Sequence, residues 1–247
     1  MYIKNASEIK IMRQSGKILA KILNRLVLEV KPGKTAADLE NLAQKLLIHY
    51  KAKPAFLGFG GYKYATCISL NNEVVHGLPT SDKIIKIGDL VKIDFGVLFK
   101  GFNTDAATTV IVGKTNKKAH KMVTVTRESL DLAIKMIKPG ISLDSIQSAI
   151  QKYIETNGFG VVRDLAGHGI GKNLQEEPSI PNFYKYGASI TLKEGMTFCI
   201  EPMVNMRSWK VITADDGWTV KTWDDSLSAH FEHTLLVTKK GCEILTK

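Results

Sequence analysis

The stretch Val30-Lys31-Pro32-Gly33 recurs 107 residues later as Ile137-Lys138-Pro139-Gly140 in a chain of 247 residues. The same offset relates further positions of the two halves: Lys86, Gly88, Ile93 and Asp94 correspond to Lys193, Gly195, Ile200 and Glu201. Chance gives one such match but not a series in one register, and the repeat is too long and too few for a solenoid. We therefore expect one domain, residues 1–247, built of two pseudo-symmetric halves at about 1–113 and 114–247.

Each half begins with the pattern of two helices. Apolar residues in 6–29 recur every three or four positions, which predicts one buried helix face. Thr35 and Asp38 resemble a capping box and predict the start of a second helix. The second half repeats this pattern, with helices near 117–137 and 143–157.

Strand patterns follow each helix pair: 64–70, 90–98 and 105–112, then 161–166, 196–205, 218–222 and 231–238. A unit of two helices and a sheet cannot cover both faces of its sheet alone. Two copies about a pseudo-twofold axis solve that problem and leave a site between them. The predicted class is therefore α+β, with an antiparallel sheet flanked by two pairs of helices.

Composition excludes several classes of protein. Hydrophobic residues make up 44% and charged residues 23% of the chain, as in ordinary globular proteins. No apolar run approaches the roughly 20 residues that span a bilayer. Residues 1–5 lack the apolar core of a secretory signal, and Cys67, Cys199 and Cys242 show no paired spacing. We expect a cytoplasmic protein with no membrane contact.

The formal net charge of +10 leaves two interpretations open. A basic balance of this size favours contact with a polyanion such as RNA. A lysine-rich, solvated surface gives the same charge, and the lysines here are scattered rather than gathered in one block.

Two carboxylates stand where strand patterns predict buried positions. Asp94 lies in the apolar stretch 90–96, and its repeat mate Glu201 lies in 196–203. Acidic residues are depleted in strands, and a lone buried carboxylate costs several kcal/mol unless something compensates it. Two carboxylates at equivalent positions indicate a cation shared between the halves.

Three more residues extend this pattern. Asp105 and Glu232 each stand near the start of a predicted strand, and His168 is flanked by glycines. Each of the five residues alone is more often an ordinary turn, edge or structural residue than a ligand. Together they repel one another unless a counter-charge is present, and two divalent ions roughly 3.5–4 Å apart supply it. An oxygen-rich set with one histidine favours Mn, Fe or Co over a structural zinc site.

The chain resembles the bacterial type I methionine aminopeptidase family over almost its whole length. The motifs that carry the resemblance are 69–79 (Ser-Leu-Asn-Asn-Glu-Val-Val-His-Gly-Leu-Pro), Asp94, Asp105, Gly167-His168-Gly169-Ile170-Gly171, Glu201-Pro202 and Glu232-His233. The resemblance implies the pita-bread fold and a single catalytic domain. It also implies a metal-dependent hydrolase that removes the initiator methionine from nascent proteins whose second residue is small. We expect a monomer, with ribosome or RNA contact through its basic surface.

By position, the resemblance also implies a role for each ligand. Asp94 would bind one metal ion through two oxygens, and His168 with Glu201 would bind the other. Asp105 and Glu232 would bridge the two ions, which are Co, Mn, Fe or Zn in this family.

Three residues would take part in catalysis. The resemblance makes Glu201 the proton shuttle and places His76 near the scissile amide. The family usually has a second histidine seven residues after His168, and here that residue is Gln175. A glutamine amide can donate a hydrogen bond, but it cannot carry a positive charge or relay a proton.

The resemblance also implies a substrate pocket for the methionine side chain. Its predicted members are Phe56, Phe59, Tyr62, Cys67, His76, Leu174, Gln175 and Trp218. Aromatic residues at such spacings are more often ordinary core residues. The glycines at 58, 60 and 61 favour a shaped, exposed loop instead.

Two other functions compete with this hypothesis. A non-catalytic binding module on the same fold is favoured by the basic charge and by Gln175, but all five ligand residues are present. A dipeptidase or Xaa-Pro aminopeptidase would be expected to carry a large N-terminal domain before the first helix, and the sequence shows none. Cleavage of Met-Ala-Ser or of Ala-Pro-Xaa peptides separates these hypotheses.

Overall fold

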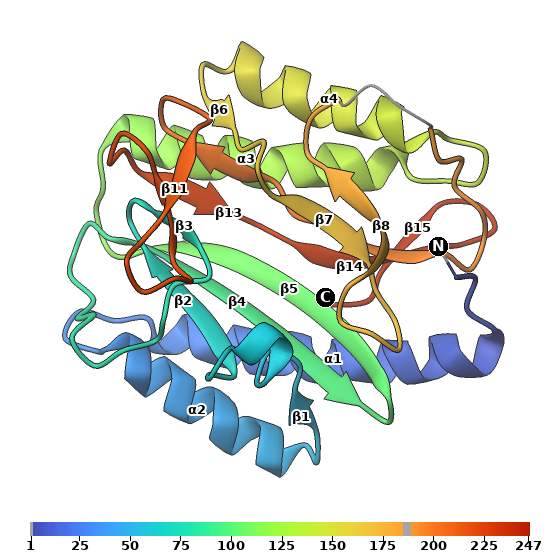
Figure 1. Ribbon diagram of the computed structural model, residues 1–247, viewed down its shortest axis with the longest axis horizontal. Helices are drawn as coiled ribbons and strands as arrows, with labels where there is room; N and C mark the ends of the chain where they lie inside the picture. The colour runs from blue at the N-terminus through green and yellow to red at the C-terminus, as the bar shows by residue number, and fades with distance from the viewer. Residues whose placement is uncertain (1, 185–188) are drawn as a thin grey trace.

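Two pairs of helices enclose layers of antiparallel strands (Figure 1). The computed structural model describes residues 2–184 and 189–247. Helices α1 (Ala6–Glu29) and α2 (Ala36–His49) lie on one side, and α3 (Lys117–Met136) and α4 (Leu143–Thr156) lie on the other. The predicted α+β class with two flanking helix pairs is confirmed.

Side-chain caps fix where the first two helices begin. Asn5 accepts hydrogen bonds from the backbone N–H groups of Ser7 and Glu8 at the start of α1. At the start of α2, the Asp38 N–H donates to Thr35 Oγ1 at 3.1 Å, and the Thr35 N–H donates to Asp38 Oδ2 at 2.9 Å. Each pair satisfies backbone donors that the helix itself leaves free. The predicted capping box of α2 is confirmed.

The strands of the described residues form four antiparallel sheets. The first contains β1 (Lys53–Pro54), β2 (Thr66–Leu70), β4 (Leu90–Phe99) and β5 (Phe102–Ile111). The second contains β7 (Ala166–Gly169), β8 (Glu176–Pro181), β9 (Thr197–Ile200), β14 (His233–Val237) and β15 (Cys242–Ile244). The third contains β6 (Gly160–Val161), β10 (Met203–Asn205) and β13 (Ser228–His230). The fourth contains β3 (Glu73–Val75), β11 (Val211–Thr213) and β12 (Val220–Thr222).

The second half divides strands that the sequence predicts as continuous. The predicted strand 196–205 is split into β9 and β10 at Glu201-Pro202, because proline has no N–H to donate to a ladder. The predicted strand 231–238 starts only at His233, after a break from β13. The predicted strand 161–166 is wrong, since only its two ends belong to strands, β6 and β7.

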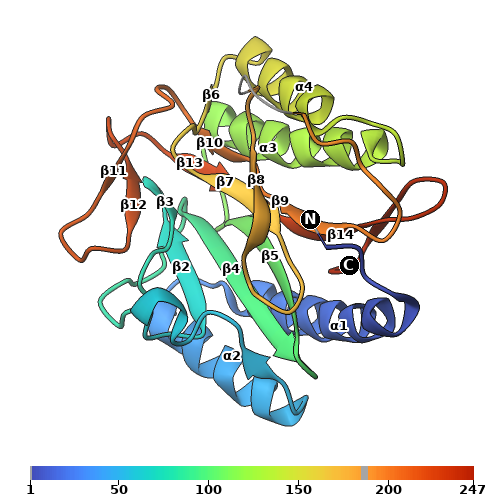
Figure 2. The ribbon, with the colours of Figure 1, turned by 45° about the vertical axis from the view of Figure 1, so that its right-hand side comes forward.

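The two halves form the same local hydrogen bonds at the 107-residue offset. The Gly33 N–H donates to the Ile85 carbonyl at 2.9 Å, and the Gly140 N–H donates to the Leu192 carbonyl at 2.9 Å. The bridge between Thr35 and Ile84 likewise corresponds to the bridge between Ser142 and Thr191. These bonds hold the loop after each first helix against the segment that leads into the central strands (Figure 2).

The halves join through β5 and the break between β13 and β14. The Glu232 N–H donates to the Ala107 carbonyl at 2.9 Å, and the Ala107 N–H donates back to the Glu232 carbonyl at 3.4 Å. One apolar core lies under α1 and α2 and a second lies under α3 and α4, and the central strands contribute to both. Within residues 2–184 and 189–247, no helix is both long and apolar enough to cross a membrane.

Candidate metal centre and substrate pocket

The five predicted ligand residues line one cavity of about 250 Å³. They come from both halves: Asp94 from β4, Asp105 from β5, His168 from β7, Glu201 from the break after β9, and Glu232 from the residue before β14. Local features of the strands aim them inward. Pro202 ends β9 directly after Glu201, so that this side chain leaves the ladder at the cavity.

Gly167 allows β7 to approach β9 closely. A Cβ atom at this position would lie 2.3 Å from the Cys199 carbonyl oxygen, which is far inside van der Waals contact. Because glycine has no Cβ, the strand passes close to β9 and brings His168 into the cavity.

Three carboxylates converge at one end of the centre. Ligand oxygens of Asp94, Asp105 and Glu232 all lie within 4.8 Å of one another. Asp94 Oδ1, Asp105 Oδ1 and Glu232 Oε1 are buried and have no hydrogen-bond partner among the described residues. A buried, unpaired carboxylate oxygen is costly, so this group fits a cation.

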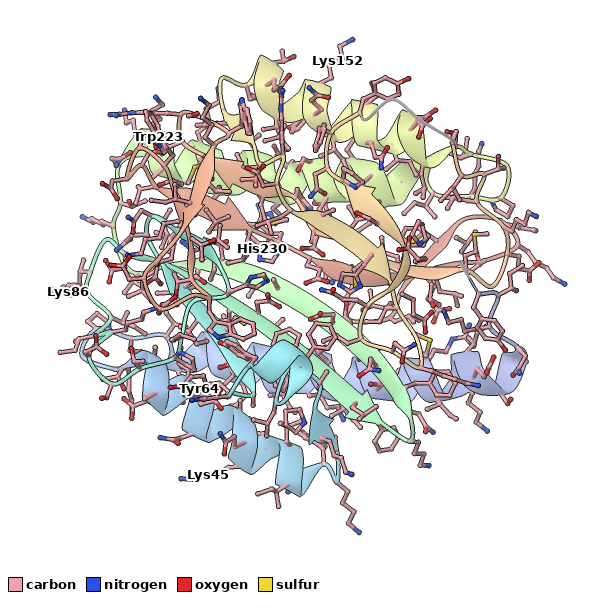
Figure 3. The ribbon with its side chains drawn as sticks, viewed as in Figure 1. Lys45, Tyr64, Lys86, Lys152, Trp223 and His230 are labelled. Atoms are coloured by element: carbon pink, nitrogen blue, oxygen red, sulfur yellow. The ribbon has the colours of Figure 1, made fainter. Side chains whose placement is uncertain are left out.

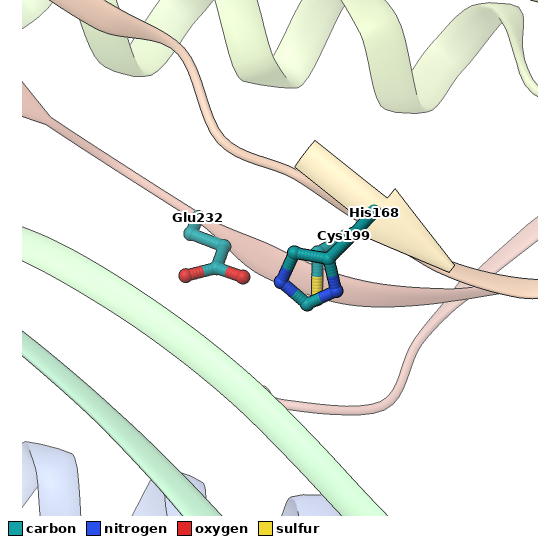
Figure 4. A group of neighbouring side chains, drawn as sticks. All are labelled: His168, Cys199 and Glu232. Carbon is teal, nitrogen blue, oxygen red and sulfur yellow. The ribbon is translucent and has the colours of Figure 1, made fainter. Parts of the chain in front are cut away.

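A second group adjoins the first. Ligand atoms of His168, Cys199 and Glu232 lie within 4.8 Å of one another, and Figure 4 shows the three side chains facing the same space. His168 Nε2 lies 3.7 Å from Glu201 Oε1. Glu232 belongs to both groups, so the two candidate ligand groups share one carboxylate.

The tautomer of His168 suits a ligand. Its Nδ1 lies 2.9 Å from the Gly169 carbonyl oxygen, which can only accept a hydrogen bond. Nδ1 therefore carries the hydrogen, and the lone pair of Nε2 is free for a metal ion. Burial also lowers the pKa of His168, which favours the neutral ring that metal binding requires.

The raised pKa values of the carboxyl groups also indicate a cation site. Burial, and next the charge of Asp105, raise the pKa values of Asp94, Glu201 and Glu232 well above the ordinary range. Burial raises the pKa of Asp105 to about 7. Without a cation, the group relieves its repulsion by holding protons. The unpaired oxygens, the neutral imidazole and the oxygen-rich donor set fit divalent ions.

Cys199 is a neighbour of the centre that the sequence did not indicate as a site residue. Its side chain is fully buried, and burial together with Glu232 raises the pKa of the thiol well above its ordinary value. A signal existed, because Cys199 precedes Glu201 by two residues and alternate residues of a strand share a face.

In the structure, the residue of the second half that is equivalent to Asp105 is not Glu232. In the sequence, Asp105 and Glu232 share one property, since each stands near the start of a predicted strand. In the structure, Asp105 exchanges hydrogen bonds with Thr234 Oγ1, while the backbone of His230 does so with Thr109 Oγ1. The structural equivalent of Asp105 is therefore the fully buried His230, seen near the centre of Figure 3.

The eight predicted pocket residues line the same cavity as the carboxylates: Phe56, Phe59, Tyr62, Cys67, His76, Leu174, Gln175 and Trp218. Tyr62 and Trp218 stack edge to face, with ring centroids 5.0 Å apart. The Tyr62 hydroxyl donates to the Thr66 carbonyl oxygen at 3.0 Å, which fixes this ring. Trp218 comes from the loop between β11 and β12, an insertion without a counterpart in the first half.

The two polar members of the pocket differ in setting. His76 follows β3 with a positive φ of 57°, and burial lowers the pKa of its ring. Gln175 is exposed and ends the loop between β7 and β8, at the edge of the cavity. The cavity thus combines apolar and aromatic side chains, the acidic ligand residues and two further polar side chains.

Comparisons with known proteins support one family. The sequence profile of metallopeptidase family M24 matches residues 10–239. The methionine aminopeptidase of Clostridium perfringens is 46% identical over 244 residues, which cover 99% of this chain and 98% of that protein.

Solved structures agree with this match. The methionine aminopeptidase of Thermotoga maritima superimposes with a TM-score of 0.98 at 50% identity, covering 100% of this chain and 99% of that one. The prolidase of Pyrococcus furiosus superimposes with a TM-score of 0.80 at 27% identity, covering 99% of this chain and 65% of that one. The expected pita-bread fold is confirmed.

Proposed function

Because this chain belongs to metallopeptidase family M24, we propose that it is a methionine aminopeptidase, which hydrolyses the bond after the N-terminal methionine of nascent proteins. The observation that carries the proposal is one cavity that joins five ligand side chains to an apolar wall. A volume of about 250 Å³ is small beside pockets for drug-sized ligands, so it suits a single side chain. The second residue of the substrate is small, as in the family that the sequence resembles.

We propose that the centre holds two divalent ions, drawn from Co, Mn, Fe and Zn. Asp94 would hold one ion and His168 with Glu201 would hold the other, with Asp105 and Glu232 as ligands common to both. The shared position of Glu232 in both ligand groups supports this arrangement. When bound, the ions polarise the scissile carbonyl and activate a water molecule.

The protein side chains supply the remaining steps. Glu201, whose Oε1 lies 3.7 Å from His168 Nε2, accepts the proton of the attacking water and passes it to the leaving amine, the role that the family resemblance gives it. His76 is half-buried and its lowered pKa favours the neutral ring, so it can donate a hydrogen bond beside the scissile amide. Gln175, at the edge of the cavity, orients the substrate carbonyl through its amide N–H.

The test is hydrolysis by metal-free protein after each metal is restored singly. We expect release of methionine from Met-Ala-Ser, slow cleavage of Met-Tyr-Ser, and none of Ala-Pro-Xaa. Glu232→Gln serves as the variant that removes the charge of the shared ligand. If Ala-Pro-Xaa were the preferred substrate, the prolidase-like alternative would replace this proposal. No hydrolysis with any metal would favour a binding module.

We also propose that the protein contacts RNA, such as that of the ribosome, through its basic surface. Arg163 lies 5.2 Å from the ring centroid of Trp209, and Lys210 lies 5.8 Å from that of Trp223. Trp223 is 61% exposed at the edge of the molecule (Figure 3). Trp209 is half-buried, but an exposed aromatic ring such as Trp223 beside a cation suits a stacked base and its phosphate.

Cosedimentation with ribosomes at low and high salt tests this contact. The double variant Trp223→Ala and Lys210→Glu should weaken it. Lys45→Glu changes the charge on α2, at the opposite side of Figure 3, and should have little effect. Equal binding by both variants would contradict the proposal. Cell fractionation and sedimentation test the accompanying expectations of a cytoplasmic location and a monomer.

A further inference from the structure

Lys4 is a charged residue in the interior of the protein. Its side chain is 0% exposed, and its Nζ lies 2.8 Å from Glu176 Oε2, whose side chain is 14% exposed. Lysine is almost never buried without a partner, because taking an unpaired ammonium out of water is expensive. This pair links residues that are 172 positions apart in the sequence.

The backbone on either side of Lys4 is held in place. The Lys4 N–H donates to the Gly195 carbonyl oxygen at 2.9 Å, and Ile3 forms a bridge with Met196. Asn5 then caps α1. Lys4 thus projects from a fixed point, since a strand contact precedes it and a helix start follows it.

Glu176 is the first residue of β8 and directly follows the loop 170–175 between β7 and β8. Its Oε2 accepts a hydrogen bond from Lys4 Nζ, and its Oε1 accepts one from the Asn173 N–H at 3.2 Å. The Gly171 N–H donates to the Asn173 carbonyl at 3.1 Å, so Glu176 holds a residue whose own backbone closes the turn of the loop. Two other residues of the loop, Leu174 and Gln175, line the substrate cavity.

Gly171 makes room for this ion pair. A Cβ atom there would lie 2.5 Å from Lys4 Cε and 2.7 Å from Glu176 Oε1. The ion pair therefore lies directly against the backbone of the loop, where a side chain at this position would displace it.

Asn103 of β5 holds the loop from its other side. The Asn103 N–H donates to the Gly171 carbonyl at 2.7 Å, and its Nδ2 donates to the Lys172 carbonyl at 3.0 Å. These bonds fix the first part of the loop independently of Lys4. Loss of the ion pair should therefore loosen Asn173 to Gln175 without unfolding the protein.

We propose that the buried Lys4–Glu176 ion pair positions the loop 170–175, and with it Leu174 and Gln175, for substrate binding. Lys4 is a positioning residue that acts through Glu176. The proposal rests on the proposed function only for the identity of the substrate.

The test compares Lys4→Met with the conservative variant Lys4→Arg in the full chain. A loop that adopts the competent arrangement a tenth of the time raises KM about tenfold. We expect this rise in KM for Met-Ala-Ser in Lys4→Met, with kcat changed much less and partial rescue in Lys4→Arg. Glu176→Gln should behave like Lys4→Met. Affinity for Mn²⁺, measured by calorimetry, should not change.

Lys172→Met is the matched control. Lys172 lies in the same loop and its Nζ is 3.7 Å from Glu8 Oε1, but its side chain is 66% exposed, so this pair contributes little. A rise in KM as large as that of Lys4→Met would overturn the proposal. A fall in Tm with KM unchanged in Lys4→Met would also overturn it, because Lys4 would then be merely structural.

Hydrogen–deuterium exchange separates this proposal from the proposed function. Amides of residues 173–175 should exchange faster in Lys4→Met than in wild type, while those of 166–169 should not change. This readout needs no substrate. Faster exchange in a protein that hydrolyses no Met peptide would retain the positioning role and reject the function. Unchanged exchange would reject the positioning role.

Discussion

Three acidic residues of the cavity have buried oxygens that no basic side chain neutralises among the described residues. Asp94, Asp105 and Glu232 each keep one buried oxygen without a hydrogen bond among the residues that the structure describes. No lysine or arginine forms an ion pair with them within the described part of the chain. The charge of these residues therefore depends on pH and on metal.

The stability of the metal-free protein should depend on Asp105. Burial raises its folded-state pKa to about 7, above its ordinary value of 3.8. A raised carboxyl pKa contributes stability that is present below the unfolded pKa and lost as pH rises through the folded pKa. Metal-free wild type should therefore lose stability as pH rises from about 4 to about 7, and level off above that, relative to Asp105→Asn, which cannot ionise.

Thermal unfolding of both proteins in EDTA measures this difference. Groups shared by the two proteins, such as the buried histidines, largely cancel in the comparison. Parallel curves of Tm against pH would contradict the prediction. Saturating Mn²⁺ should remove the loss in wild type, since the ion then replaces the proton.

Gln175 stands where the family usually has a histidine. Gln175→His should raise turnover if proton donation or a fixed imidazole contact limits the rate, by up to about 10²-fold. The measurement is kcat and kcat/KM for Met-Ala-Ser across about pH 6–9. Unchanged kinetics would show that this position only orients the substrate.

At the scale of elements, the centre depends on breaks in the strands of the second half. Pro202 divides β9 from β10, and a second break divides β13 from β14. Glu201 and Glu232 occupy these two breaks, whereas Asp94 and Asp105 lie within the continuous strands β4 and β5. The two halves thus share the alignment of their central strands, but these strands are continuous in the first half and interrupted in the second.

Thr234 of β14 connects the second half to Asp105, a predicted metal ligand in β5. Its hydroxyl donates to the Asp105 carbonyl at 2.8 Å and accepts the Asp105 N–H at 2.8 Å. Thr234→Val keeps the shape but leaves both groups unpaired, which should cost about 1–3 kcal/mol in the free energy of unfolding. Calorimetry should also show weaker binding of Mn²⁺, because the backbone of Asp105 is less well fixed.

The repeat offers its own control, Thr109→Val. The Thr109 hydroxyl forms the equivalent two bonds with the backbone of His230, which lines no part of the cavity. We expect a similar loss of stability in urea unfolding but a smaller loss of metal affinity. Equal effects on metal affinity would mean that the hydroxyls act on the whole interface rather than on Asp105.

At the scale of the whole molecule, neither half holds the centre alone. The first half supplies Asp94 and Asp105, and the second supplies His168, Glu201 and Glu232. Metal binding should therefore stabilise both halves as one unit. At a concentration 100 times Kd, one bound ion adds about 2.7 kcal/mol to the free energy of unfolding.

Calorimetric unfolding with increasing Mn²⁺ checks this expectation. A single transition should move to higher temperature, and Glu232→Ala should reduce the shift, since this residue belongs to both ligand groups. Two separate transitions, or a shift of equal size in Glu232→Ala, would contradict it.

Much of the architecture could be predicted because helices and long strands leave recognisable patterns in the local sequence. All four helices begin within a residue or two of their predicted starts, since apolar periodicity and caps such as Thr35 with Asp38 are local signals. Short strands were missed, among them β3, β8 and β13, because three to six residues carry too little pattern. The division of one expected sheet into four also escaped prediction, since it depends on how broken strands pair.

Residue types in the sequence were enough to predict the chemistry of the site: a pair of carboxylates at equivalent strand positions, a histidine between glycines, and aromatic residues around them. Residue type is enough for that, because acids in apolar strands need compensation wherever they are. The folded chain was needed to show which residues are neighbours. It placed Cys199 beside His168 and Glu232, matched Asp105 with His230, and brought Lys4 to Glu176 across 172 positions of sequence. Such proximity arises from packing between distant segments, which no local pattern of residues encodes.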